Sequence, residues 1–346
     1  MVIDLLAQAD YPGAKKSTVN LNYSEDIGNV GKFSFRKITK AFDYARQLSD
    51  LINQTPSKLG PPVIYYPPCS PNLIPFLRDL LFFNLVPTEK AHWVFHFHAG
   101  GLPEFINSSL WKKAAINLFF PKPTTCIDLS PDGMPSTDVF TTAQRVVLPH
   151  GLETPDPTNR TSDTSPVELL FVGNLFESKG IDLTIHAVAN LKEDHPVHLN
   201  VLGGSDQQRI DELNQLVTEL DLAENVTLQG VVTGEDKWDF FRKADVFVFP
   251  TYYESEKYPI VLLEALGMGL PIVSTKWRGV PSIVTEETGI LAEPKSLPEL
   301  TEALRTYLSD PGKRLKAGRA ARQRYEAEYT KERYLTRFQK VFQNAR

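Results

Sequence analysis

Short apolar runs alternate with amphipathic helical patterns between residues 169 and 291, and this alternation constrains the fold more than any other feature of the sequence. Strands that alternate with helices form β-α units, and such units build a mainly parallel sheet with helices on both faces. We therefore expect an α/β domain here. The expected strands are 169–172, 199–202, 226–229, 246–249, 271–274 and 289–291, and the expected helices are 182–191, 208–220, 235–243 and 259–266.

The first half of the chain shows a weaker form of the same alternation, which predicts a second α/β domain. Between the two halves lies ETPDPTNRTSDTSP, residues 153–166, which has almost no apolar side chains and predicts a linker. The patterns before it predict helices at 42–52, 73–84 and 103–119 and strands at 62–65, 93–97, 124–129 and 145–148, and those that end the chain predict helices at 311–329 and 331–344.

Length, charge and cysteine content narrow the class of protein. A chain of 346 residues exceeds one ordinary core and fits two domains. The formal net charge of -5 argues against a general nucleic-acid binder, which usually carries a strong basic excess. Cys69 and Cys126 are too few for a disulfide framework, and no stretch approaches the ~18 uninterrupted apolar residues of a membrane span. The start also lacks the pattern of a secretory signal. We expect a soluble, cytoplasmic protein.

The most informative segment follows the expected strand 246–249. A polar loop leads to Pro259, which we expect to begin a short apolar helix because proline suits the first helical turn. The free N–H groups of residues 259–261 then face the loop. A helix N-terminus at the end of a parallel strand is an anion site, and a diphosphate would fit it.

Two carboxylates, Glu256 and Glu264, flank the beginning of this helix. Eight residues at ~1.5 Å each place them roughly 12 Å apart along the axis. This is too far for the pair of a retaining glycosidase, whose carboxyl groups are ~5 Å apart. The spacing suits two groups that bind hydroxyls at opposite ends of one elongated ligand, such as a nucleotide sugar. The plain alternative is a solvated loop residue and a surface helix residue.

The same segment resembles the E-x7-E signature of family 4 glycosyltransferases, including the continuation Leu-Leu-Glu-Ala-Leu-Gly-Met-Gly-Leu-Pro-Ile-Val. The resemblance covers about residues 167–330. It implies an α/β fold of the GT-B type, with two Rossmann-like domains facing across a cleft. It also implies metal-independent sugar transfer, with retention of configuration, from a nucleoside-diphosphate sugar of the UDP or GDP type and with no further cofactor.

By this resemblance Glu256 contacts the donor sugar and Glu264 the ribose. The backbone near Ile260 and Val261 binds the diphosphate, and Tyr258 and Pro259 belong to the same donor site.

A second signature is Phe171-Val-Gly-Asn-Leu-Phe-Glu-Ser-Lys-Gly. The expected strand ends at Gly173, and Lys179 lies near the beginning of the next helix. A lysine there opposes the helix dipole and costs stability unless an anion is bound, so Lys179 is a candidate for neutralising the leaving diphosphate. A solvated loop lysine is the alternative. The family usually has arginine at Asn174, which can still donate a hydrogen bond but brings no charge.

Weaker signatures follow further along the chain. Gly203-Gly204 resembles the glycine loop that lets the backbone approach the nucleotide, although glycines after a strand are also common turns. Gly230 and Val231 match the strand end whose backbone reads the base. The run that begins at Arg278 matches a pattern in which the family usually has glutamate at Ser282.

In the first half, His96 and His98 alternate on one side of the expected strand 93–97 and its end. These two histidines could suggest a metal site, but no third ligand follows at a sensible spacing. A buried structural histidine is the plain alternative to a functional one. His98 best matches the histidine that reaches the transferred sugar in the resembling family, so we count it as catalytic together with Glu256 and Lys179. His150 stands where the family has asparagine at the domain crossover.

The resemblance also divides the chain. It implies an acceptor-side domain at 1–152, a linker at 153–166, a donor domain at 167–328, and a C-terminal helix at 329–346 that crosses back to the first domain. The family opens with a strand and a Gly-Gly loop, whereas residues 1–30 contain only Tyr11-Pro-Gly-Ala. We therefore expect this first element to be missing.

The sequence predicts a retaining hexosyltransferase that passes a sugar to a carbohydrate or lipid-linked hydroxyl, in polysaccharide, lipopolysaccharide or glycolipid biosynthesis. Trp111, Lys112 and Lys113 suit peripheral membrane contact, or equally a solvated helix face. Two alternatives stay open: a nucleotide-sugar-binding protein without transfer activity, and a sugar-nucleotide epimerase of the same fold.

Overall fold

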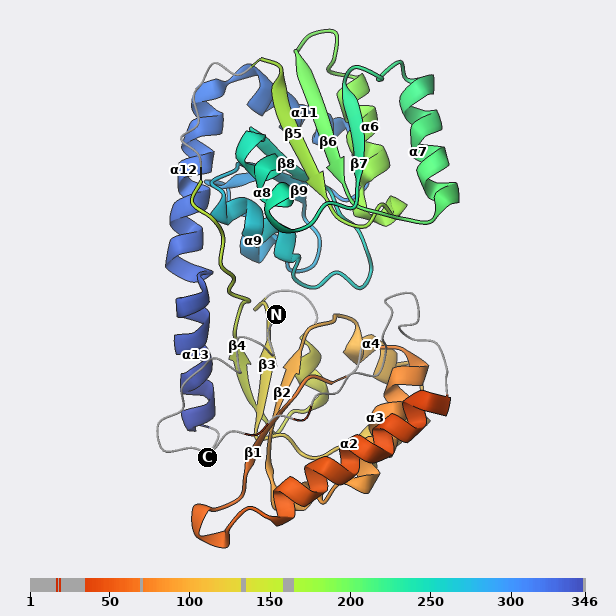
Figure 1. Cartoon of the computed structure of the whole chain (residues 1–346), viewed down its shortest axis with the longest axis vertical. Helices are drawn as coiled ribbons and strands as arrows, with labels where there is room; N and C mark the ends of the chain where they lie inside the picture. Colours follow the sequence, from red (N-terminus) through yellow and green to blue (C-terminus); the bar gives the residue numbers. More distant parts are fainter. Residues whose placement is uncertain are drawn as a thin grey trace. The chain divides into compact units, whose positions relative to one another are not determined.

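The computed structural model describes residues 17, 19, 35–68, 71–131, 135–157 and 165–344. Contacts within the chain divide it into two compact units (Figure 1). Unit 1 comprises Met1–Pro149 and Leu335–Arg346, and unit 2 comprises His150–Tyr334. The expectation about a missing first strand and Gly-Gly loop lies outside the described residues.

Unit 1 contains a four-stranded parallel sheet whose order follows the sequence. One face carries an aromatic core from the sheet and its covering helices, in which Tyr66 stacks on Phe82 and Phe83 packs on Trp93. The opposite face presents Tyr65 to the aromatic rings of the C-terminal helix. The strands are β1 (Val63–Tyr66), β2 (His92–Phe97), β3 (Thr125–Asp128) and β4 (Gln144–Val147).

The expected helix 103–119 is wrong as a single element. It is two helices, because the chain becomes extended at Ser109, and the hydroxyl of Ser108 bonds the Phe105 carbonyl at 2.8 Å. Serine side chains compete with the helix ladder in this way and favour helix ends. The helices of unit 1 are α2 (Phe35–Asn53), α3 (Leu73–Leu85), α4 (Leu102–Asn107) and α5 (Leu110–Phe119).

Unit 2 contains a six-stranded parallel sheet in the order β10-β9-β8-β5-β6-β7. The chain starts in the middle at β5, runs outward through β6 and β7, and then returns to β8 on the other side of β5. The strands are β5 (Val167–Val172), β6 (Val197–Leu202), β7 (Val226–Gly230), β8 (Val246–Phe249), β9 (Ile272–Thr275) and β10 (Gly289–Ala292).

Because the strand order reverses at β5 and such crossovers are right-handed, we expect α8 and α9 to cover the face opposite α6 and α7 (Figure 1). The later helix α11 packs against α6, so it returns to the first face. Two expectations about these helices are wrong. Pro259 is extended and precedes α9 instead of beginning it. The helix α11, which Ser296 caps by accepting from the Glu299 amide, was not expected at all. The helices are α6 (Ile181–Ala189), α7 (Gln207–Glu219), α8 (Gly234–Lys243), α9 (Ile260–Gly267), α10 (Val280–Ile283) and α11 (Leu297–Ser309).

Two long helices, α12 (Pro311–Glu328) and α13 (Lys331–Asn344), end the described chain. Tyr325 of α12 donates its hydroxyl to the Leu152 carbonyl at 2.8 Å, and Gly151 lies so close to Thr330 that an added Cβ would be 2.6 Å from its carbonyl oxygen. These contacts attach the segment after Pro149 to unit 2. Among the described residues, no helix is both long and apolar enough to span a membrane.

Candidate functional site

The loops that follow β5 and β8 form the centre of the candidate site. These two strands are neighbours in the sheet, yet the chain leaves them in opposite directions, toward β6 and toward β9. Such a switch point opens a crevice at the carboxyl ends of the strands, where α/β sheets bind their ligands. Lys179 lies in the first loop, in a 3-10 turn (Glu177–Lys179), and Glu256 lies in the second.

Lys179 and Glu256 form an ion pair across this switch point. Their side chains are only 12% and 14% exposed, and the ammonium group also lies 4.4 Å from the centre of the Tyr253 ring. Neither is therefore a solvated loop residue. The structure brings together the two residues that the sequence assigned to the diphosphate and to the sugar.

Backbone contacts hold the two loops against each other. The Tyr252 amide donates to the Ser178 carbonyl at 2.8 Å. Gly180 has φ +84, and a Cβ there would lie 2.3 Å from the Pro250 carbonyl oxygen. Only glycine fits both this backbone conformation and this close approach, so the Lys179–Glu256 pair rests on a rigid support.

The N-terminus of α9 opens at the same edge of the sheet. Pro259 precedes the helix and provides no side-chain cap. The backbone N–H groups of Ile260 and Val261 have no hydrogen-bond partner within the described part of the chain, while the amide of Leu262 donates to the Pro259 carbonyl at 3.1 Å. Free amides at a helix N-terminus attract anions through the helix dipole.

Glu264 lies one turn further along α9 and is largely buried, not a surface residue. Its Oε1 accepts from Lys237 Nζ at 2.7 Å, and its side chain is 12% exposed. Burial raises the pKa of Glu264, and the nearby ammonium group of Lys237 offsets part of that rise. The second oxygen, Oε2, is buried without a hydrogen-bond partner among the described residues.

Glycines bring the neighbouring loops close to the crevice. Gly203, after β6, has φ +154, and a Cβ there would lie 1.8 Å from the Gly173 carbonyl oxygen. Gly230 has φ +72 and open space around it, and Val231 beside it is 74% exposed. The carboxyl end of β7 therefore presents one exposed apolar side chain, which lies beside Gly204 of the loop after β6.

The remaining predicted donor residues lie in different surroundings. Asn174 is exposed after β5. Tyr258 is buried, its ring centre 6.3 Å from that of His150, and burial with the neighbouring Tyr329 raises its pKa well above the usual range. Its ring therefore packs inside unit 2.

His98 belongs to unit 1, directly after β2. The hydroxyl of Tyr65 lies 3.3 Å from His98 Nε2 and 2.9 Å from Nδ1 of the fully buried His96. The two imidazole centres are 4.1 Å apart, as expected for alternate residues on one side. Within the described ranges, no group of three or more His, Cys, Asp or Glu side chains is placed to hold a metal ion.

Lys237 and Tyr253 are the residues of this site that the sequence did not reveal. Tyr253 is fixed by a 2.8 Å hydrogen bond from the Trp277 indole to its carbonyl. The pattern of α8 indicates only an amphipathic helix, and nothing in the spacing connects Lys237 with a carboxylate 27 residues later.

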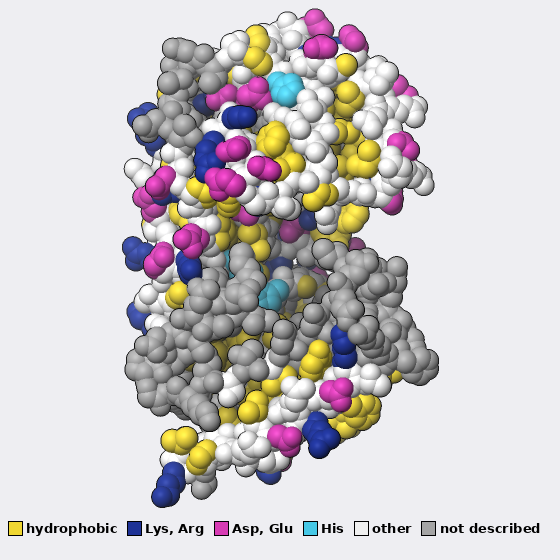
Figure 2. All heavy atoms as spheres, in the orientation of Figure 1, with side chains coloured by type: hydrophobic (Ala, Val, Ile, Leu, Met, Phe, Trp, Pro, Cys, Tyr) yellow, Lys and Arg dark blue, Asp and Glu magenta, His cyan; other side chains and the backbone are white. Residues whose placement is uncertain are grey.

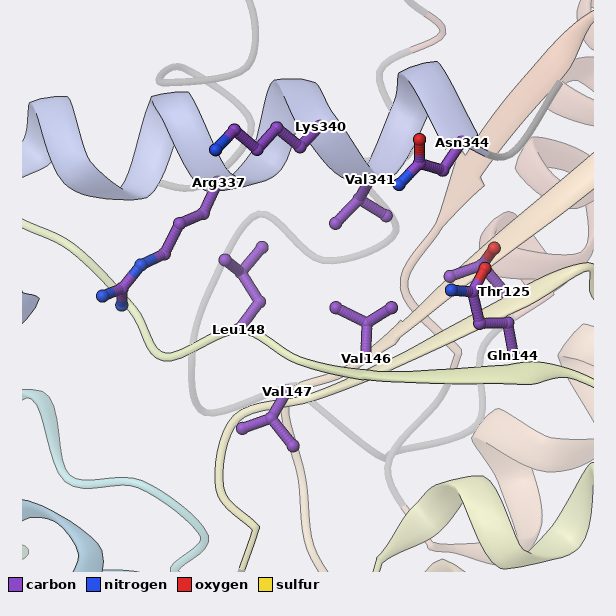
Figure 3. Close-up of a pocket in the computed structure, with 9 residues that line it drawn as sticks. All are labelled: Thr125, Gln144, Val146, Val147, Leu148, Arg337, Lys340, Val341 and Asn344. Atoms are coloured by element: carbon purple, nitrogen blue, oxygen red, sulfur yellow. The ribbon is translucent and has the colours of Figure 1, made fainter.

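Unit 1 contains a cavity of about 240 Å³ between β4 and the end of α13 (Figure 3). Val146 of β4 and Leu148 just after it point toward the helix, and Arg337 and Lys340 lie along the helical side of the cavity. None of the predicted site residues lines it. On the face of the molecule seen in Figure 2, acidic and basic side chains are interspersed, as the small net charge suggests.

Comparison with known proteins identifies the half of the chain that carries the Lys179–Glu256 pair. The model of the family "Glycosyl transferases group 1" matches residues 155–324. This half of the chain is a group 1 glycosyltransferase domain. The loops with Lys179 and Glu256 and the helix with Glu264 all lie inside the matched region.

Curated relatives are 30% identical to this chain over the part that aligns. A D-inositol 3-phosphate glycosyltransferase of Pseudarthrobacter chlorophenolicus is 30% identical over 201 residues, which cover 56% of this chain and 45% of that protein. A glycogen synthase of Mycobacterium tuberculosis is 30% identical over 178 residues, covering 48% and 40%. The chain thus spans less than half the length of these relatives.

Solved structures resemble a larger part of the chain. Sucrose-phosphate synthase from Thermosynechococcus elongatus has a TM-score of 0.65 at 22% identity and covers 88% of this chain and 79% of its own. Anabaena HepE, solved in complex with UDP, has a TM-score of 0.70 at 16% identity and covers 87% and 82%. The group 1 glycosyltransferase domain is therefore part of a chain with the GT-B fold, as the sequence predicted.

Proposed function

We propose that this protein transfers a sugar from a nucleoside-diphosphate sugar to a hydroxyl acceptor, with retention of the anomeric configuration. The observation that carries this proposal is the convergence of Lys179, Glu256 and the unpartnered amides of α9 at one switch point. Side by side, these groups provide a cation, a carboxylate that accepts hydrogen bonds from hydroxyl groups, and an anion site. A sugar joined to a diphosphate needs all three.

Lys179 and the α9 amides are the groups that would stabilise the leaving diphosphate. They are preorganised before any ligand binds, and such fixed charges favour the developing negative charge of the transition state. In the proposed reaction the bond from C1 to the diphosphate oxygen breaks while the acceptor oxygen bonds C1 on the same face. The acceptor proton passes to the departing diphosphate, and no metal ion or further cofactor takes part in this scheme.

Glu256 and Glu264 would orient the donor. Glu256, already ordered by Lys179, would accept hydrogen bonds from the sugar hydroxyls, and Glu264 would accept from the ribose. Val231 and the open backbone at Gly230 would contact the base, which we propose to be uracil or guanine. Complexes of Anabaena HepE with UDP and with UDP-glucose support a UDP-type donor for this fold.

The acceptor side would include His98, oriented by Tyr65. We propose a carbohydrate or lipid-linked hydroxyl as acceptor, within polysaccharide, lipopolysaccharide or glycolipid synthesis in the cytoplasm. Trp111, 48% exposed on α5, would serve peripheral contact with the membrane if the acceptor is lipid-linked.

A panel of UDP-, GDP- and ADP-sugars, scored by calorimetry and by release of the nucleoside diphosphate, tests the proposal. We expect nucleotide sugars of one base class to bind and to be hydrolysed slowly, with release of the nucleoside diphosphate. Glu256→Gln should slow this release by about a hundredfold or more. Binding without any release would instead indicate a nucleotide-sugar-binding protein, and an altered but intact nucleotide sugar would indicate an epimerase.

A further inference from the structure

Lys237 connects two helices on one face of the unit 2 sheet. It lies in α8, and its Nζ donates to Oε1 of Glu264 in α9 at 2.7 Å. Both side chains are mostly buried, at 21% and 12% exposed. A lysine held this way loses much side-chain entropy, and a partly buried pair forms only where its geometry offsets that loss.

The pair leaves half of the Glu264 carboxylate unused. Oε2 is buried and accepts no hydrogen bond from any described residue. A buried acceptor without a partner is costly, and native proteins keep few of them. A ligand hydroxyl that donates to Oε2 would remove this cost.

We propose that Lys237 is a positioning residue of the donor site, which holds Glu264 through Oε1 so that Oε2 receives a ribose hydroxyl of the donor. The inference rests on the proposed function, because it takes the donor to be a nucleoside-diphosphate sugar. The inference adds Lys237, which lies outside the loops after β5 and β8, to the donor site. It also explains why a cation at this position would be useful.

The charged surroundings of Glu264 support this role. Burial raises the pKa of Glu264, and Lys237 is the cation that lowers it. Glu264 is the only titratable residue of α9, and β9 has none. Arg322 of α12, a helix that packs on α9, bonds the Gly267 carbonyl at 2.6 Å and pairs with Glu326 and Asp156. Arg242 of α8 pairs with Glu235 and Asp239.

Removing the ammonium group therefore has two consequences. Glu264 is free to rotate, and its pKa rises further, so the carboxylate becomes protonated at a higher pH. A protonated carboxyl accepts hydrogen bonds less well than a carboxylate. Both effects weaken recognition of the ribose and leave the diphosphate and the base untouched.

The experiment measures binding of the nucleoside-diphosphate glucose that the panel identifies, together with its 2′-deoxyribose analogue, between pH 5.5 and 8.5. The proteins are the wild type, Lys237→Met, Lys237→Arg and Lys237→Gln. Arg242→Met is the matched control, since it removes one cation from the same helix and its carboxylate partners lie within that helix. Thermal unfolding confirms that each variant is folded.

We expect the wild type to prefer the ribose form by about tenfold, as a hydrogen bond to a charged group provides. Lys237→Met and Lys237→Gln should reduce the preference to within about threefold and lose affinity at a higher pH than the wild type. Lys237→Arg and Arg242→Met should keep it.

Equal losses for the ribose and deoxyribose donors in Lys237→Met would show a merely structural role and overturn the inference. An unchanged preference and an unchanged pH profile would overturn it as well. If no nucleoside-diphosphate sugar binds the wild type, the proposed function itself is wrong and the inference falls with it.

Discussion

Lys179 and Glu256 are 77 residues apart in the sequence and form one ion pair where β5 and β8 lie side by side. The pair joins the two loops of the switch point and is mostly shielded from water. In a ligand-free crevice each charge compensates the other. A bound nucleotide sugar could interact with both members of the pair. Its diphosphate would offer negative charge to Lys179, and its sugar hydroxyls would donate hydrogen bonds to Glu256.

Breaking this pair from either side should destabilise unit 2. Lys179→Met leaves a mostly buried carboxylate without its cation, and Glu256→Gln leaves a mostly buried ammonium group without its anion. Because both side chains retain some exposure, we expect a loss of about 1–3 kcal/mol in the free energy of unfolding for each. Urea denaturation measures it. The double variant should lose less than the sum, and strict additivity would show that the two groups do not interact.

The same two variants should also reduce sugar transfer, by about a hundredfold or more, since each removes a preorganised charge from the reacting centre. The initial rate of nucleoside-diphosphate release measures this effect. Lys276→Met is the control, because it removes an exposed lysine whose partner is the exposed Glu293. Transfer at the wild-type rate in Lys179→Met would contradict the proposed mechanism.

Gly203→Ala should be strongly destabilising and should weaken donor binding. The added Cβ would meet the Gly173 carbonyl oxygen at 1.8 Å, so the loop after β6 must move away from the loop after β5. We expect a loss of about 2–4 kcal/mol in urea denaturation. Gly234→Ala is the matched control, with φ +66 and open space around it, and should cost about 1 kcal/mol. Equal losses in the two variants would mean that the close approach is unimportant.

The stability of the ligand-free protein should show the raised pKa of Glu264. Its folded-state pKa lies above the reference value of 4.5, so the folded protein takes up this proton before the unfolded chain does. Stability from this group is therefore gained as the pH falls through the folded pKa and is complete below about 4.5. Relative to Glu264→Gln, the wild type should gain stability on acidification. Urea denaturation of both proteins between pH 7 and pH 4.5 measures the difference, and parallel profiles would contradict the expectation.

Tyr65→Phe should separate the two functions of this side chain. The ring packs 5.5 Å from Phe338 and remains in the variant, so we expect the melting temperature to change little. The hydroxyl beside His98 and His96 is lost, and kcat/KM for transfer should fall by about tenfold if it orients His98. An unchanged kcat/KM would exclude this positioning role.

Much of unit 2 could be predicted from local patterns. The strands β5 to β10 match the expected runs to within two residues, because each is an apolar run between helices and turns. The expectations failed where short polar residues decide where a helix begins or ends. Ser108 and Ser109 divide one apolar pattern into α4 and α5, and the Ser296 cap of α11 was overlooked although Glu299 stands at the capping-box spacing.

Some features of the candidate site can likewise be predicted from local patterns, and others cannot. Local patterns are enough to predict the parallel α/β fold, the glycine loops and the order of Lys179, Glu256 and Glu264, since these depend on periodicity, on backbone freedom and on residue spacing. The contacts of Lys179 with Glu256 and of Lys237 with Glu264 became visible only in the folded chain. Both contacts depend on which strands are neighbours in the sheet and which helices share a face, and these are properties of long-range packing that no local pattern encodes.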